Sequence, residues 1–166
     1  MKFDSSIVQT RYESPLGPMI VAATARGVAG VWFDGQRHLP DLAAWPQADA
    51  EHPVLALAVQ QLQQYFAGTR TQFELPLDLQ GGTPFQQSVW HALLGIPSGA
   101  TDSYGALSQR IGKPAAVRAV GAAVGRNPLS IVVPCHRVLG ANGALTGYAG
   151  GLERKAALLQ LEGALI

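Results

Sequence analysis

The first third of the chain alternates short apolar segments with turn residues. β-Branched and aromatic side chains are concentrated in residues 7–12, 19–23 and 28–33, and Ser14 to Gly17 form a turn sequence between the first two segments. Apolar segments with Gly, Pro and Asp between them are typical of strands joined by tight turns. We therefore expect two β-hairpins, followed by a loop rich in Pro, Asp and Ala over residues 34–52.

A helix and an extended segment follow that loop. In residues 53–67, large apolar side chains recur at Leu55, Leu57, Leu62 and Phe66. This spacing predicts an amphipathic helix. Residues 73–79 are rich in strand-forming side chains again, and we expect an extended conformation for them.

The residue pattern of the sequence changes from mostly strand-like to mostly helical at Gly81 and Gly82. The next residues, Thr83 to Gln86, provide an N-cap, a proline at the first helical position and a glutamine that completes a capping box. We expect a helix to begin there and a domain boundary to lie just before it. The boundary divides the chain into residues 1–80 and residues 81–166.

The second half has a mostly helical pattern. The expected helices cover residues 84–94, 104–111, 115–125 and 152–161. A Gly-Lys-Pro break separates the middle two, so this pair has the size of a helix-turn-helix, although an ordinary helical hairpin would show the same pattern. Small side chains in the second helix of the pair would let its backbone approach another helix or a nucleic-acid groove closely.

Composition and charge exclude several classes of protein. A single cysteine among 166 residues cannot form an internal disulfide, and neither a CxxC pair nor a Cys/His cluster indicates a zinc site. No apolar stretch approaches the roughly 20 residues of a membrane span, and the N-terminus lacks a signal core. We expect a cytoplasmic protein without a metal or cofactor.

The two halves of the chain differ in the sign of their charge. Residues 1–80 hold five Lys/Arg against eight Asp/Glu, a net charge of −3, and residues 81–166 hold seven against three, a net charge of +4. An excess of positive charge suggests a surface that faces a polyanion. With so few charges, this observation is weak by itself.

The single cysteine, Cys135, lies where an apolar run meets two polar side chains. The run Ile131 to Val133 is expected to be a buried strand ending at Pro134, and His136 and Arg137 follow the cysteine. Neighbouring cationic or basic groups lower a thiol's pKa and favour the nucleophilic thiolate. A structural cysteine is the alternative, because free cysteines are usually buried. Two polar residues directly after a buried strand favour a reactive site.

Six motifs in the second half point to a family when they are taken together. They are Ser103-Tyr104-Gly105, Arg118-Ala119-Val120-Gly121, Asn127-Pro128, Pro134-Cys135-His136-Arg137-Val138, Thr146-Gly147-Tyr148-Ala149-Gly150-Gly151 and Leu158-Leu159-Gln160-Leu161-Glu162-Gly163. In order and spacing they resemble the methylated-DNA–protein-cysteine methyltransferases, which are O6-alkylguanine-DNA alkyltransferases. The resemblance is dense over residues 81–163 and looser before them.

The resemblance implies an architecture and a partner. An N-terminal α/β domain, with an antiparallel sheet and a helix in a ribonuclease-H-like arrangement, would precede a mostly α-helical domain with a winged helix-turn-helix. The partner would be double-stranded DNA containing O6-alkylguanine, bound in the minor groove by a monomer, and cooperative binding stays open. The damaged base would be flipped out and its alkyl group moved irreversibly to Cys135, with O4-methylthymine as a second expected substrate.

The resemblance also assigns roles to individual residues. The catalytic set would be Cys135 as the nucleophile, His136 as its base, Glu162 as the carboxylate that orients the base, Tyr104 as the proton donor to the leaving guanine, and Asn127 as a hinge. Substrate contacts would come from Arg118, Pro134, Arg137, Val138, Tyr148 and Ala149. DNA contacts would come from Ser103, Tyr104, Ala115, Arg118, Ala119 and Gly121. The walls near Ser130, Gly140 and Thr146 would limit the size of the alkyl group.

Two other classes of function remain compatible with the residues alone. One is a helix-turn-helix DNA-binding module in which the cysteine is structural. The other is a hydrolase or redox protein that uses Cys135 with His136. Transfer of an alkyl label from DNA, binding without transfer, and repeated turnover of an ester or peroxide distinguish the three classes.

Overall fold

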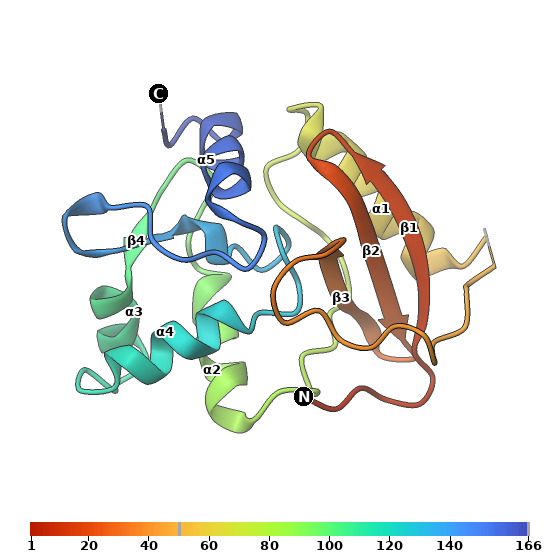
Figure 1. Ribbon diagram of the computed structural model, residues 1–166, viewed down its shortest axis with the longest axis horizontal. Helices are drawn as coiled ribbons and strands as arrows, with labels where there is room; N and C mark the ends of the chain where they lie inside the picture. The colour runs from red at the N-terminus through yellow and green to blue at the C-terminus, as the bar shows by residue number, and fades with distance from the viewer. Residues whose placement is uncertain (50, 166) are drawn as a thin grey trace.

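A three-stranded antiparallel sheet forms the first half of the molecule in the computed structural model, which describes residues 1–49 and 51–165 (Figure 1). Strands β1 (Val8–Ser14), β2 (Gly17–Thr24) and β3 (Gly27–Phe33) pair in the order β1-β2-β3 through two tight hairpins. The two hairpins predicted from the sequence are thereby confirmed.

Both faces of this sheet are covered, which explains why β2 and β3 are almost continuously apolar. Helix α1 (Pro53–Phe66) packs Leu55, Ala58 and Leu62 into the core on one face. On the other face, the loop after β3 brings Trp45 against Trp32, with ring centroids 5.7 Å apart. Both faces of the sheet are therefore buried.

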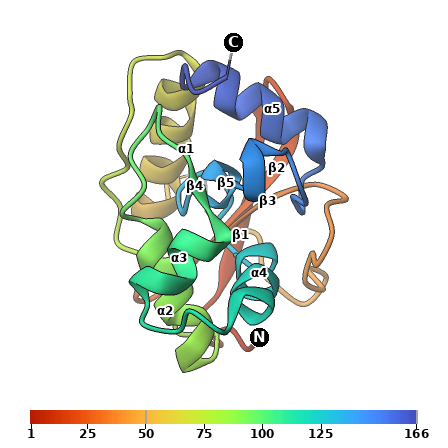
Figure 2. The same ribbon diagram turned by 90° about the vertical axis from the view of Figure 1, so that its left-hand side faces the viewer.

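The second half consists mainly of helices: α2 (Pro84–Leu93), α3 (Tyr104–Arg110), α4 (Val117–Gly125) and α5 (Leu152–Leu161). Thr83 caps α2 as expected, because its hydroxyl accepts from the Gln86 amide while the Gln86 side chain accepts from the Thr83 amide. Figure 2 shows α2, α3 and α4 grouped below α5. The short strands β4 (Asp102–Ser103) and β5 (Val138–Leu139) pair in parallel.

The two halves are joined through the core and through backbone hydrogen bonds. The amide of Val31 in β3 donates to the carbonyl of Pro128 at 2.8 Å, and the Ser130 amide donates back to Val31 at 2.9 Å. The segment that leads to Cys135 is thus attached to the edge of the N-terminal sheet. Its position depends on both halves.

The sequence prediction of a strand at residues 131–134 was wrong. Residues 129–134 form successive turns, in which the Val133 amide donates to the Leu129 carbonyl and Ile131 has a φ of +73°. Residues 135–137 then form a 3₁₀ turn, η1 (Cys135–Arg137). The run is apolar because the core encloses it, with Ile131 only 1% exposed, and not because it belongs to a sheet.

Two further expectations concern extended structure and membranes. Residues 73–79 are extended, but they pair with the sheet only around Leu77, where the Val28 amide donates to Pro76 and the Asp78 amide donates to Val28. A second 3₁₀ turn, η2 (Ala141–Gly143), interrupts the loop before α5. Within the described residues, no helix has the length and hydropathy that crossing a bilayer requires.

Candidate active site

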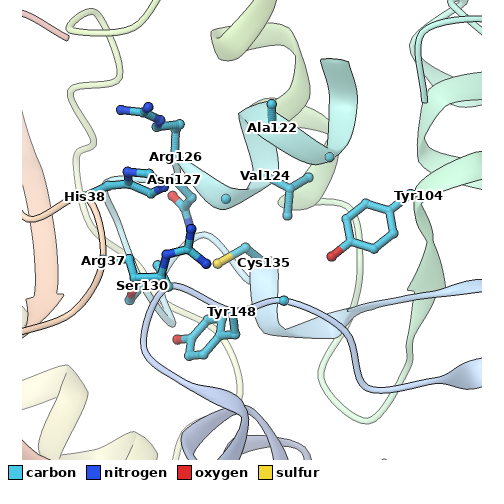
Figure 3. A pocket seen from close by; sticks show the side chains of 14 residues that line it. Arg37, His38, Tyr104, Ala122, Val124, Arg126, Asn127, Ser130, Cys135 and Tyr148 are labelled. Atoms are coloured by element: carbon cyan, nitrogen blue, oxygen red, sulfur yellow. The ribbon is translucent and has the colours of Figure 1, made fainter. Parts of the chain in front are cut away.

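Cys135 lies in a cavity of about 310 Å³ between the two halves of the chain (Figure 3). Its walls come from the loop after β3, from α3 and α4, from the segment that follows α4, and from the loop before α5. The predicted site residues among its lining are Tyr104, Gly121, Asn127, Cys135, Tyr148 and Ala149, together with the expected wall residue Ser130. The cysteine is 7% exposed, so a reactant must enter the cavity to reach it.

His136 and Glu162 form a buried pair directly behind the cysteine. Nε2 of His136 lies 2.8 Å from Oε2 of Glu162, and the two side chains are 0% and 1% exposed. They are 26 residues apart in the chain, and η1 and the end of α5 bring them together. The structure thus unites the base and the orienting carboxylate that the resemblance implied.

Two further donors complete the surroundings of Glu162. Arg137 donates through Nε to Oε1 at 2.8 Å and through Nη2 to Oε2 at 2.9 Å, and the hydroxyl of Tyr65 donates to Oε2 at 2.6 Å. Burial alone would raise the pKa of Glu162, but hydrogen bonds from His136, Arg137 and Tyr65 outweigh it and lower the pKa to about 2. Glu162 is therefore an anion at any physiological pH.

The other ring nitrogen of His136 is buried without a partner. Nδ1 has no hydrogen-bond partner among the described residues, although a buried polar atom normally finds one. Burial, assisted by the charges of Arg137 and Lys155, lowers the pKa of His136 against the opposing effect of Glu162. The imidazole is thus neutral near pH 7, with one nitrogen directed to Glu162 and the other able to accept a proton.

The thiol itself is not held as a thiolate. Burial raises the pKa of Cys135, and the Asn127 side chain and the charge of Lys155 oppose this increase only in part. This reverses the sequence expectation that neighbouring His136 and Arg137 would lower the thiol's pKa. The guanidinium of Arg137 is committed to Glu162 and to the Ile96 carbonyl, so it does not stabilise the sulfur.

Asn127 ties the end of α4 to the segment that carries the cysteine. Its Nδ2 donates to the carbonyls of Val133 at 2.7 Å and Leu129 at 3.3 Å, and its Oδ1 accepts from the Leu129 amide at 2.9 Å. All three bonds are buried. These bonds fix the end of α4 relative to the segment that leads to Cys135.

One face of α4 is exposed and composed mostly of small residues. Arg118, Ala119 and Ala122 are exposed, whereas Val120 and Val124 are buried against the core. Ala115 is exposed too, but it precedes the helix, which begins at Val117 rather than at the expected residue 115. A surface of small side chains lets backbone approach a partner closely.

Two tyrosines lie on different walls of the cavity. Tyr104 begins α3 directly after Ser103, whose hydroxyl caps that helix by accepting from the Ala106 amide. Tyr148 is buried, and its hydroxyl has no partner among the described residues. Burial raises the pKa of both tyrosines, so both remain protonated and able to donate.

The position of Tyr148 depends on a neighbouring glycine. A Cβ atom on Gly150 would lie 2.7 Å from the Tyr148 ring and 3.0 Å from Phe33. No real side chain could occupy that space without moving the ring. Gly150 therefore allows Tyr148 to reach its place in the wall.

Some predicted residues lie elsewhere. Six predicted residues lie outside the cavity lining as the structure describes it: the exposed Arg118 and Ala119, the half-buried Ser103, and Pro134, Arg137 and Val138. The carbonyl of Val138 accepts from the buried Nζ of Lys155 at 2.6 Å. A Cβ atom on Gly140 would lie 3.1 Å from Thr146, and neither residue is among the described lining residues.

Several residues of the site were missed from the sequence, and besides those discussed next they include the lining residues Ala122, Val124, Gly125, Arg126 and Gly147. Arg37 and His38 line the cavity from the loop after β3, opposite Tyr104 in Figure 3. Tyr65 and Lys155 lie behind it, and Nζ of Lys155 donates to three carbonyls in residues 138–147. Arg37 and His38 resembled ordinary loop residues, and Tyr65 belongs to the apolar face of a helix. The lysine, in the middle of α5, resembled a solvated one.

The acidic, histidine and cysteine side chains do not gather into a metal site. Across residues 1–49 and 51–165, no group of three or more His, Cys, Asp or Glu side chains is placed to hold an ion. What the arrangement offers instead is a thiol, a neutral base with an ionised partner, and two phenol donors around one cavity. These groups suit a nucleophilic displacement with proton transfer.

Comparisons with known proteins agree along the whole chain. Residues 7–79 match the family described as 6-O-methylguanine DNA methyltransferase, ribonuclease-like domain, and residues 84–164 match its DNA binding domain. The methylated-DNA–protein-cysteine methyltransferase of Mycobacterium tuberculosis is 50% identical over 151 residues, 90% of this chain and 88% of the relative. The constitutive enzyme of Bacillus subtilis is 49% identical over 159 residues, 92% of this chain and 93% of the relative.

Solved structures give the same result. The crystal structure of Mycobacterium tuberculosis OGT in complex with DNA matches this chain with a TM-score of 0.85 and 47% sequence identity. The match covers 93% of this chain and 91% of the chain in that structure. The fold, the family matches and the identities extend well beyond the reactive turn. The chain belongs to the methylated-DNA–protein-cysteine methyltransferase family.

Proposed function

We propose that this protein repairs DNA directly, by moving an alkyl group from O6 of guanine to Sγ of Cys135. The observation that carries the proposal is the placement of the single cysteine in a cavity between the small-residue helix α4 and the buried His136–Glu162 pair. Because the alkyl group lies inside the duplex, the damaged nucleotide has to be extruded, which costs a few kcal/mol.

Helix α4 and its residue Arg118 make the main contacts with DNA. The exposed small face of α4 enters the minor groove, assisted by Ala115, Ala119 and Gly121, and the guanidinium of Arg118 fills the space that the flipped base leaves. A long planar cation can stack on bases and donate to an unpaired edge. Ser103 and Tyr104 lie at the adjacent helix N-terminus, where they meet the backbone of the strand.

The proton of the thiol leaves through His136. Nδ1, which has no described partner, accepts this proton by way of a water molecule, and Glu162 stabilises the resulting imidazolium through Nε2. This is the nucleophile–base–orienter arrangement of a catalytic triad. It supplies a thiolate on demand, which the raised pKa of Cys135 makes necessary.

The thiolate then displaces guanine from the alkyl carbon. A carbon–sulfur bond forms, the carbon–O6 bond breaks, and the electron pair remains on the purine. Tyr104 donates a proton or hydrogen bond to the departing base, and the backbone at Tyr148 and Ala149 contacts the O6 side. The carbonyls of Cys135 and Val138 select guanine by accepting from its exocyclic amine, and the Val138 oxygen keeps a second lone pair beside Lys155.

The reaction consumes the protein, because the acids and bases of the site do not cleave a thioether. Pro134 shapes the turn before the thiol, and Arg137 acts on Glu162 and not on the substrate. We also propose a domain boundary after residue 80, a monomer as the working form, and O4-methylthymine as a second substrate.

Incubation with duplex DNA that carries labelled O6-methylguanine tests the proposal. We expect one label per protein molecule on Cys135, and none on Cys135→Ala. Binding without transfer would instead support a DNA-binding module with a structural cysteine. Repeated turnover of an ester or peroxide would support a cysteine hydrolase or a redox protein, and either outcome would overturn the proposal.

A further inference from the structure

Tyr65 connects the N-terminal half of the protein to the buried base. It lies on α1, 97 residues before Glu162 in the chain, and its hydroxyl donates to Oε2 of Glu162 at 2.6 Å. The same oxygen lies 2.8 Å from Nε2 of His136. Tyr65 is 2% exposed, and its ring packs against Phe66 and Phe73, so the hydroxyl has a fixed direction.

We propose that Tyr65 is a positioning residue for alkyl transfer, which shares Glu162 with His136 and thereby limits how strongly His136 holds a proton. The inference rests on the proposed function, since it assigns Tyr65 to the base of that same reaction. It also gives the N-terminal half a part in the chemistry beyond support.

Glu162 divides its negative charge between His136 and the Tyr65 hydroxyl. A hydrogen bond to an ionised carboxylate stabilises the anion and weakens its attraction for other protons. With the Tyr65 hydroxyl in place, Oε2 stabilises the imidazolium less, and His136 remains neutral and ready to accept the thiol's proton near pH 7. Without it, the pKa of His136 would be higher, so the imidazole would stay protonated, and unable to act as a base, up to a higher pH.

The other charged and titratable groups around His136 do not replace this effect. Arg137 from η1 and Lys155 from α5 carry positive charge and also disfavour the imidazolium, whereas the Cys135 thiol is uncharged until it reacts. Burial and the Glu162 charge raise the pKa of Tyr65 far above its ordinary value. Tyr65 therefore donates throughout the working pH range, and Glu162 accepts throughout it.

The test is Tyr65→Phe, which removes the hydroxyl and keeps the ring. The single-turnover rate on O6-methylguanine duplex is measured against pH with saturating DNA. We expect the midpoint of the acid limb to rise by about one pH unit, so that transfer well below the midpoint is about tenfold slower. The DNA concentration at half-maximal rate should not change, because Tyr65 lies behind the cavity.

Tyr12→Phe is the matched control. Tyr12 lies on β1 and packs against Phe66, the last residue of α1, and its hydroxyl makes no hydrogen bond among the described residues. This variant should keep the wild-type pH profile. If both variants shift alike, or if the Tyr65→Phe midpoint stays or falls, the assignment of Tyr65 is wrong.

A second measurement does not depend on the reaction. NMR titration of the imidazole of His136 in DNA-free protein should show a higher pKa in Tyr65→Phe than in wild type, and an unchanged value would overturn the assignment. Failure of the wild type to accept the label would contradict the proposed function instead. The NMR comparison would still decide the role of Tyr65.

Discussion

Glu162→Gln is the perturbation whose magnitude follows most directly from the structure. The substitution keeps the shape of the side chain and removes its charge, while Arg137 remains buried opposite it. The pKa of Glu162 falls from 4.5 to about 2 in the folded protein, which corresponds to about 3 kcal/mol of stability at neutral pH. Removing one partner of a buried ion pair costs about 3–5 kcal/mol, which agrees in scale.

The sign of the pH dependence follows from the direction of this shift. A carboxyl whose pKa is lower in the folded state stabilises the fold fully above pH 4.5, and this contribution is lost as the pH falls from 4.5 towards 2. The wild type should therefore lose stability more steeply than Glu162→Gln in this window. The difference in slope should approach at most about 1.4 kcal/mol per pH unit, the value for one proton.

Urea unfolding followed by tryptophan fluorescence measures both quantities, at pH 7 and at intervals down to pH 3. Glu153→Gln is a suitable control, since Glu153 is exposed in the first turn of α5 and should change stability by less than about 0.5 kcal/mol. A loss under about 1 kcal/mol at pH 7 for Glu162→Gln, or parallel acid limbs for wild type and variant, would refute the reasoning.

Three further substitutions test other parts of the site. Arg118→Ala should slow repair of duplex DNA far more than reaction with a free O6-substituted guanine, which needs no flipping. Equal losses in the two rate assays would contradict the proposal that Arg118 fills the space left by the flipped base. Asn127→Ala removes three buried hydrogen bonds and should cost about 2–4 kcal/mol in urea unfolding while slowing transfer. Lys155→Met leaves carbonyls in residues 138–147 without their donor and should cost about 2–3 kcal/mol, and an unchanged unfolding midpoint would show that the lysine does not hold the loop.

Local signals in the sequence were sufficient for most helices and strands. The capping residues Thr83 and Gln86 act within one turn of chain, so their pattern identifies the start of α2 without any knowledge of the fold. The run at residues 131–133 misled for the opposite reason. Its apolar character reflects enclosure by distant segments, and a buried turn and a buried strand have the same composition.

The candidate site was predictable to the extent that motifs carry it. Cys135 and His136 stood out from their position after an apolar run, Glu162 was found through the family resemblance, and the structure places His136 and Glu162 2.8 Å apart. Tyr65 and Arg37 could not be found in that way, because their roles depend on which surfaces of the first half meet the second half. No periodicity or spacing along one chain records such a meeting.

The long-range bond to Glu162 has a consequence for the newly made chain. The surroundings of this carboxylate combine α1 with the end of α5, so a folding intermediate in which only the second half is ordered lacks the Tyr65 donor to Glu162. Under the proposed mechanism, Cys135 is therefore expected to reach its full rate near pH 7 only after both halves have docked, which limits premature reaction of the thiol during biosynthesis.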